Sequence, residues 1–187
     1  HIRDVYMAHR HALEAVKDAG VTVHGDGRTQ PFAMSSGIEF APVTDEEKIT
    51  ACSLAKAAGA GMLMMMPPYH GTGLRADENG MLEHFSRVAE AAGVPIMVQD
   101  APLSGVSLSV PFLVRLAQKV PQVRYFKIEV PGAAAKLRFL IEQGGAAIEG
   151  PFDGEESITL MADLDAGATG TMPSALLPDL IKPVLQH

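Results

Sequence analysis

The chain has 187 residues, of which 47% are hydrophobic and 20% are charged, and its net charge at pH 7 is −7. This composition is typical of a globular protein with a sizeable core. It argues against nucleic acid as the main partner, because phosphate binding requires clustered Lys and Arg and the basic residues here are scattered. The longest apolar stretch, residues 61–68, is far shorter than the roughly 20 residues that cross a bilayer. We therefore expect neither nucleic acid nor a membrane as a partner.

The cysteine content and the first residues of the chain bear on the cellular compartment of the protein. Cys52 is the only cysteine, so the chain cannot form an internal disulfide, and its first residues contain no apolar signal-peptide segment. Both observations favour the cytoplasm. Because the chain begins with His1 rather than Met and its last residues continue a helical pattern, we expect both ends to be truncated.

Short apolar segments alternate with longer amphipathic segments along the chain, which is typical of parallel βα units. Thr44 and Glu47 form a capping-box pattern at the start of one such helix, and Gly59 ends it. In chain order, the first half of the sequence predicts a helix over 3–19, a strand over 31–36, a helix over 45–58, a strand over 61–68, a helix over 79–92 and a strand over 95–102.

The second half continues the same alternation. Ser109 caps its first helix, and Pro111 lies in the first turn, where proline is tolerated. We expect the last helix to be broken near Pro178 and Pro183. The predicted elements are a helix over 110–119, a strand over 123–128, a helix over 132–143, a strand over 146–150, a helix over 155–165, a strand over 167–172 and a helix over 175–186.

Two α/β architectures fit this order, an open doubly wound sheet and a (β/α)8 TIM barrel. A complete barrel has eight units in about 250 residues, so six units in 187 residues have the density of a barrel that lacks two. Lys127 favours the barrel, because an open sheet would press its ammonium against a helix layer, where an unpaired charge is costly. We predict a single, incomplete TIM-barrel domain over residues 1–187.

The alternation of strand side chains places Tyr125, Lys127 and Glu129 on one face, and Phe126 and Ile128 on the other. The apolar pair should face the helices, which points the other three residues inward. A lysine in a semi-enclosed pocket loses hydration, and its neutral amine can then attack a carbonyl carbon. The alternative interpretation is that Lys127 ends the strand and forms a surface salt bridge with Glu129.

Further polar residues follow the other predicted strands. Gln99 and Asp100 end their strand, where polar residues in a barrel usually mark the site, although Asp100 also suits an ordinary turn. Tyr69 is a candidate proton carrier or an exposed loop residue. Glu149 and Asp153 flank a Gly-Pro turn, and such carboxylates either bind a hydroxyl or a metal or belong to a solvated loop.

No cofactor is indicated by the sequence. It contains no Cys/His cluster with zinc spacing, and neither the GxGxxG nor the GxxxxGK[ST] nucleotide motif occurs. We therefore expect neither a metal nor an organic cofactor.

Four segments together resemble the dihydrodipicolinate synthase/N-acetylneuraminate lyase family, and within it the branch of 2-keto-3-deoxy-L-arabinonate dehydratases. The resemblance is strong over residues 55–173 and holds only in outline over residues 1–54. The segments are residues 64–70 (MMMPPYH), 95–105 (PIMVQDAPLSG), 125–137 (YFKIEVPGAAAKL) and 147–156 (AIEGPFDGEE).

The resemblance implies that Lys127 forms the Schiff base with a small 2-keto acid and that Tyr69 matches a family tyrosine. Most of the family carries a proton-relaying tyrosine in a Tyr-Asn-x-Pro motif, and here the matching residues are Gln99-Asp100-Ala101-Pro102. This departure is typical of the dehydratase branch and argues against an aldolase. We predict substrate contacts from Gln99, Asp100, Glu129 and Glu149, and a homo-oligomer, either a dimer or a tetramer.

The predicted reaction is dehydration of 2-keto-3-deoxy-L-arabinonate to 2-ketoglutarate semialdehyde. Two alternatives stay open: a 2-keto acid aldolase or synthase of the same family, and a non-catalytic barrel fragment. The second arises because the resemblance leaves the first strand, the first helix, the second strand with its carboxylate-binding loop, and the C-terminal helices without counterparts. A chain of this extent is expected to be a poor catalyst.

Overall fold

The computed structural model describes residues 23–25, 28–30, 33–35, 49, 53, 61–70, 74–173 and 178–185. The chain forms two compact units, His1–Met97 and Val98–His187. The helix expected over 3–19 lies outside the described residues, as does all but residues 49 and 53 of the helix expected over 45–58. The prediction of a single domain stays a prediction.

In the first unit, two strands that were expected from the sequence pair in parallel. β3 (Ala33–Ser35) pairs with β4 (Met62–Met65), whose four residues are all buried. The N–H of Leu63 in β4 donates to the carbonyl of Pro95, just before β7 (Ile96–Asp100) begins. Two antiparallel pairs were not predicted: β1 (Val23–Gly25) with β2 (Arg28–Gln30), and β5 (Tyr69–His70) with β6 (Leu74–Arg75).

Helix α3 (Glu78–Ala92) also belongs to the first unit and confirms the helix expected over 79–92. Asp77 caps its first turn by accepting a hydrogen bond from the N–H of Gly80 at 2.8 Å. Gly93 ends the helix in the left-handed conformation, which glycine adopts without steric cost. One face of the helix is buried through residues at helical spacing: Met81, His84, Phe85, Val88, Ala89 and Ala92.

The second unit is a series of strands and helices in alternation. The boundary between the units falls within β7, and the strand order from there is β7-β8-β9-β10. β8 pairs with β9 in parallel, and β9 with β10 likewise. The elements are α4 (Val110–Lys119), β8 (Val123–Ile128), α5 (Ala133–Gly144), β9 (Gly150–Asp153), α6 (Leu160–Asp165), β10 (Gly170–Thr171) and α7 (Pro178–Leu185).

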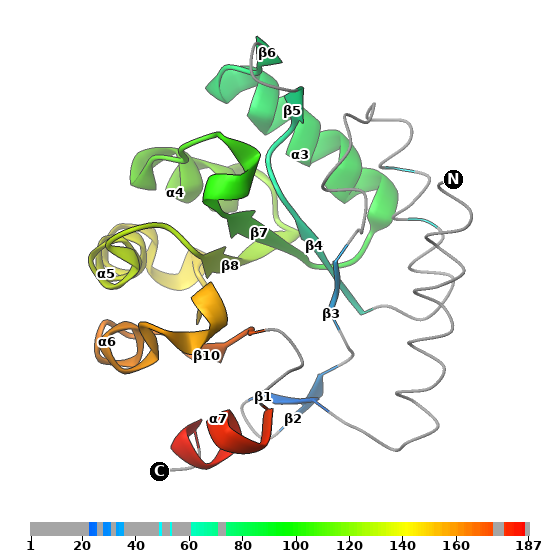
Figure 1. Ribbon diagram of the computed structural model, residues 1–187. Coiled ribbons are helices and arrows are strands. Elements are labelled where there is room, and N and C mark those ends of the chain that lie inside the picture. Colours follow the sequence, from blue (N-terminus) through cyan, green and yellow to red (C-terminus); the bar gives the residue numbers. More distant parts are fainter. Residues whose placement is uncertain are drawn as a thin grey trace. The chain divides into compact units, whose positions relative to one another are not determined.

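The helices α4, α5 and α6 lie side by side in one layer against these strands (Figure 1). Phe126 and Ile128 of β8 are fully buried, as expected for side chains that face a helix layer. Leu116 of α4 and Leu137 and Leu140 of α5 are fully buried as well. The core of this unit is therefore the apolar layer between the strands and the helices, and the opposite face of β8 is left for polar side chains.

Three predictions about single elements are wrong: the start of one strand, the continuity of one helix and a break in another. The strand expected over 146–150 begins instead at Gly150, because Gly145–Ala147 continue from α5 as a 3-10 turn. The helix expected over 155–165 is divided, because Glu156 and Ser157 have φ of 53° and 65°, outside the helical range. α7 contains Pro183 and is not broken there; Pro183 lies near the C-terminal end, where few backbone bonds depend on it.

None of the helices in the described part of the chain is both long and apolar enough to cross a membrane.

Candidate active site

The ends of β7 and β8 bring three polar side chains together in the second unit. Lys127 lies near the end of β8, where only 9% of the residue is exposed. Its Nζ lies 2.6 Å from Glu129 Oε1, and the Nε2 of Gln99 donates to Glu129 Oε2 at 2.7 Å. Glu129 therefore binds the lysine with one carboxylate oxygen and the amide with the other. We call Gln99, Lys127 and Glu129 the lysine cluster.

The lysine cluster is largely shielded from bulk water, but its charged side chains keep a small exposed fraction. The side chains of Lys127 and Glu129 are 11% and 12% exposed. Partial burial lowers the local dielectric constant, which strengthens the attraction between the ammonium and the carboxylate. This geometry rules out the interpretation of the pair as an exposed surface salt bridge, because neither side chain lies in open solvent.

Glycines on the neighbouring strand make room for this cluster. A Cβ added at Gly154, directly after β9, would overlap Cγ of Glu129. One at Gly150, at the start of β9, would overlap the ring of Tyr125. The register pairs Lys127 with Phe152, between these two glycines. Small residues on β9 thus allow the long side chains of β8 to lie across it.

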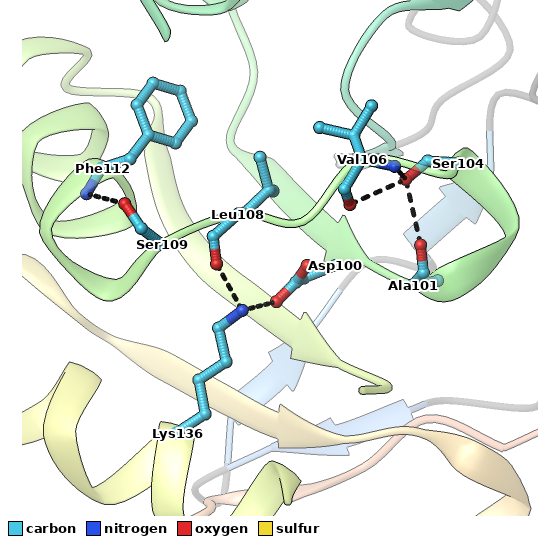
Figure 2. Close-up of polar contacts among 8 residues, drawn as sticks. All are labelled: Asp100, Ala101, Ser104, Val106, Leu108, Ser109, Phe112 and Lys136. Carbon is cyan, nitrogen blue, oxygen red and sulfur yellow. Dashed lines mark hydrogen bonds and ion pairs between the residues drawn. The ribbon is translucent and has the colours of Figure 1, made fainter. Parts of the chain in front are cut away.

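The expectation that Asp100 lies with Lys127 on one face is not met by its contacts, and its contact with a substrate stays a prediction. Asp100 Oδ2 lies 2.5 Å from Nζ of Lys136 in α5, and the carboxyl group is fully buried (Figure 2). Because Asp100 follows Gln99 directly in β7, its side chain points to the opposite face, where the helices pack. Burial raises the pKa of Asp100 above its usual value, and the ion pair with Lys136 opposes that shift.

The predicted position of Glu149 is also wrong. Glu149 precedes β9, so it lies at the amino end of that strand, while Lys127 lies near the carboxyl end of β8. Its N–H donates to the carbonyl of Arg124, and its carboxylate pairs with the exposed Arg124 guanidinium. The error follows from the misplaced strand: a β9 over 146–150 would have put Glu149 near the carboxyl end.

Asp153, not Glu149, occupies the carboxyl end of β9, but it too faces the helices. The register pairs it with Ile128, which lies on the buried apolar face. Thr159 donates to both Asp153 Oδ1 and Asp163 Oδ2 of α6, at 3.3 and 2.8 Å, and Thr171 donates to Asp153 Oδ2. Burial, reinforced by Asp163, raises the pKa of Asp153 to about 6, although the two hydroxyl groups oppose the shift.

Tyr69 lies in β5 of the first unit. Its side chain lies outside what the structure describes, so its assignment as a proton carrier stays a prediction.

Sequence reasoning missed Lys136 and Gly154. No sequence pattern indicated the pairing of Lys136 with Asp100, because Lys136 lies in a helix far along the chain from Asp100. The Gly-Glu-Glu segment after Asp153 was a signal for Gly154 only through its resemblance to the family.

The lysine cluster can perform amine chemistry with an adjacent proton acceptor. An amine, a carboxylate and an amide supply a nucleophile, an acid–base group and a neutral hydrogen-bonding group. Among the residues whose side chains are described, no three His, Cys, Asp or Glu groups converge as they would around a metal ion.

Residues 41–175 match the Dihydrodipicolinate synthetase family. The chain belongs to this family. It is 59% identical over 132 residues to an L-2-keto-3-deoxyarabonate dehydratase from Azospirillum brasilense, covering 71% of this chain and 43% of that protein. It is 26% identical over 148 residues to a 4-hydroxy-tetrahydrodipicolinate synthase from Helicobacter acinonychis, covering 75% of this chain and 47% of that protein. The chain thus spans about half the length of these curated relatives.

Solved structures share the fold. A prophage protein of the dihydrodipicolinic acid synthase family from E. coli K12, in complex with pyruvate, has a TM-score of 0.80 and 20% identity; the match covers all of this chain and 58% of that chain. The dihydrodipicolinate synthase of Cyanidioschyzon merolae, with lysine bound, has a TM-score of 0.72 and 20% identity, covering all of this chain and 56% of that chain. The expected (β/α)8 barrel, of which this chain forms part, is confirmed.

We expect Gly154→Ala to lower catalytic turnover on the order of 100-fold, because the new Cβ must displace Glu129 from Lys127 and small misplacements near reacting groups have effects of that size. Steady-state kinetics of the protein as its gene encodes it would measure this change. Gly80→Ala is the matched control, since its Cβ meets only ordinary contacts at 3.4 Å in α3. Unchanged turnover in Gly154→Ala would show that the position of Glu129 does not matter.

The Asp153 carboxyl group should make the protein less stable as pH rises. Its folded-state pKa of about 6 exceeds the usual 3.8, so the folded state holds the proton more tightly than the unfolded state. The resulting stabilisation is fully present below pH 3.8 and is lost as pH rises through 6. By linkage the loss is about 3 kcal/mol.

Urea unfolding between pH 4 and 8 tests this expectation through the difference between wild type and Asp153→Asn, which removes the titration. Asp165→Asn is the control, because that side chain is 82% exposed at the end of α6. Parallel pH profiles for the wild type and Asp153→Asn would contradict the assignment.

Proposed function

We propose that this chain supplies the Schiff-base lysine of a lyase that removes water from a 2-keto-3-deoxy sugar acid, with Lys127 as the nucleophile. The observation that carries the proposal is the partly buried Lys127 with a carboxylate oxygen of Glu129 2.6 Å from its Nζ. This geometry sets an amine nitrogen beside a proton acceptor, the pairing that attack on a carbonyl carbon requires.

The first step joins the lysine to the substrate. The neutral Nζ of Lys127 attacks C2 of the keto acid, and the carbonyl oxygen leaves as water to give a protonated imine. From its ammonium form the lysine gives up two of its three protons through Glu129, one before the attack and one after it, and the departing oxygen takes up both to leave as water, so the number of protons balances. The positive imine nitrogen then draws electron density from the neighbouring carbon and acidifies the C3–H bonds.

The second step removes the hydroxyl group. Loss of a C3 proton gives an enamine, and its electron pair expels the C4 hydroxyl, which leaves as water after gaining a proton. We assign both transfers to Glu129, the carboxylate that the structure places against Lys127. Transfer of a C5 proton, isomerisation of the resulting enol and hydrolysis of the imine then release a 2-keto aldehyde acid and restore the lysine. The net change is the loss of one water molecule.

Gln99 favours dehydration over carbon–carbon cleavage. Cleavage requires a base to take the proton of the C4 hydroxyl, and a neutral amide is not a base near pH 7. The Nε2 of Gln99 is engaged with Glu129, while its Oε1 is buried and has no hydrogen-bond partner within the described part of the chain. We assign Oε1 to accept a hydrogen bond from a substrate hydroxyl, which would hold that hydroxyl without deprotonating it.

The similarity to the Azospirillum protein supports a particular substrate. That relative is an L-2-keto-3-deoxyarabonate dehydratase, and 59% identity extends over the segment that contains the lysine cluster. We therefore propose 2-keto-3-deoxy-L-arabinonate as the substrate and 2-ketoglutarate semialdehyde as the product. Tyr69 is proposed as a further proton carrier on the family resemblance. The expected homo-oligomer and the cytoplasmic location stay predictions.

Borohydride trapping tests the nucleophile. Incubation of the protein as its gene encodes it with pyruvate and borohydride should add one reduced pyruvyl group at Lys127, seen by peptide mass spectrometry. Lys127→Ala should remove the adduct, and Lys127→Arg should do so too, because a guanidinium stays protonated and cannot form the imine. Lys119→Ala, an exposed lysine of α4, should label like the wild type. Labelling of another lysine in place of Lys127 would overturn the assignment.

A product assay separates dehydration from cleavage. With 2-keto-3-deoxy-L-arabinonate, the unmodified protein should yield mainly the semialdehyde, trapped as a hydrazone, and little pyruvate, measured with lactate dehydrogenase. Gln99→Tyr restores a hydroxyl able to relay the C4–OH proton, so the pyruvate fraction should rise. Gln99→Asn, which keeps the neutral amide, is the control and should not raise it. Mainly pyruvate from the unmodified protein would favour the aldolase instead.

A further inference from the structure

A buried ion pair lies on the helix-facing side of β7, behind the lysine cluster. Asp100 is fully buried, and the Nζ of Lys136 in α5 lies 2.5 Å from its Oδ2. The same Nζ donates to the backbone carbonyl of Leu108, in the loop between β7 and α4 (Figure 2). Lys136 of α5 thus binds both the end of β7 and the loop that follows it.

The backbone of Asp100 connects this ion pair to the lysine cluster. The carbonyl of Asp100 accepts a hydrogen bond from the N–H of Glu129 at 2.9 Å. Its neighbour in the chain, Gln99, donates from its side chain to the Glu129 carboxylate at 2.7 Å. Asp100 is therefore held by its carboxylate to α5 and by its carbonyl to the residue that pairs with Lys127. A movement of Asp100 must shift both Gln99 and Glu129.

The loop held by Lys136 is ordered by its own hydrogen bonds. The hydroxyl of Ser104 donates to the carbonyl of Ala101 at 3.0 Å and accepts from the N–H of Val106 at 3.1 Å. Ser109 caps α4 by accepting from the N–H of Phe112 at 3.2 Å. Leu108, the acceptor for Lys136, lies between these two turns, so the lysine fixes the segment that joins them.

Electrostatics explains why the buried Asp100 carboxylate requires a cation beside it. A buried carboxylate without a partner is strongly unfavourable, and removing one member of a buried pair leaves the other charge uncompensated. The charged groups that face Asp100 are Lys136, which opposes the effect of burial, and Glu129, which adds to it. Lys136 thus compensates a carboxylate whose charged form both burial and Glu129 disfavour.

We infer that Lys136 is a positioning residue for the reaction at Lys127: its ion pair with Asp100 and its bond to Leu108 set the end of β7, and through it the placement of Gln99 and Glu129. Lys136 does not belong to the lysine cluster, since it reaches Asp100 from the helix-facing side. This inference rests on the proposed function, because it assigns Lys136 a part in that same chemistry.

Kinetics of Lys136 variants test the inference in the protein as its gene encodes it. Lys136→Met keeps the length of the side chain but loses the charge, and should lower kcat on the order of 100-fold while KM changes by no more than a few-fold. Lys136→Arg can still pair with Asp100 and donate to Leu108, and should keep kcat within a few-fold of the wild type. Lys119→Met, at the exposed end of α4, is the matched control.

The pH dependence separates positioning from a general loss of stability. In Lys136→Met the unpaired Asp100 carboxylate is increasingly charged as pH rises, so the deficit in kcat relative to the wild type should grow with pH. The double variant Asp100→Asn/Lys136→Met has no buried charge, so it should fold even where the single variant does not. Its kcat should stay at least tenfold below the wild type, without that pH dependence.

The outcomes distinguish this inference from the proposed function. Failure of the wild type to trap pyruvate at Lys127 would overturn the proposed function. Trapping by the wild type, together with a kcat in folded Lys136→Met or in the double variant within twofold of the wild type, would overturn the inference alone. Equal losses in Lys136→Arg and Lys136→Met would also overturn it, because the ion pair would then not be what matters.

Discussion

The alternation of side chains along the strands is the constraint on which the polar architecture of the second unit depends. Residues two apart share a face, and neighbours point to opposite faces. Phe126 and Ile128 bury one face of β8 against the helices, so Lys127 must project from the other. The same rule separates Gln99, which meets Glu129, from Asp100, which meets α5. A slip of one residue would exchange the two groups and bury Lys127 among the helices.

On the face of the lysine cluster, one ion pair serves both stability and chemistry. The contact between Lys127 and Glu129 compensates two partly buried charges in the absence of substrate. In the proposed reaction it also holds a proton acceptor against the amine that forms the imine. Gln99 occupies the remaining carboxylate oxygen and so fixes the orientation of Glu129. The amide has no acid–base role of its own, which is the physical reason why we propose loss of water and not cleavage.

On the helix-facing side, two buried carboxyl groups, those of Asp100 and Asp153, have different kinds of neighbour. Asp100 has a lysine partner, and this pair joins β7, α5 and the loop before α4. For Asp153, burial and the nearby carboxylate of Asp163 raise the pKa to about 6, against the opposing effect of its hydroxyl donors. The first arrangement ties three elements together through charge. The second leaves a carboxyl group with a raised pKa where α6 packs against β9.

The sequence by itself determined the order of the strands and helices of the second unit and the face from which Lys127 projects, because hydrophobic periodicity is a local property that residues a few positions apart encode. It also placed Glu129 beside Lys127, since two strand residues of one face are neighbours. Only the tertiary structure decided where β9 begins, and with it that Asp153 and not Glu149 ends the strand. It alone paired Asp100 with Lys136 and brought Gly154 against Glu129. Such contacts depend on which elements pack together, and no local pattern records the partner of a charge that lies one strand and one helix away.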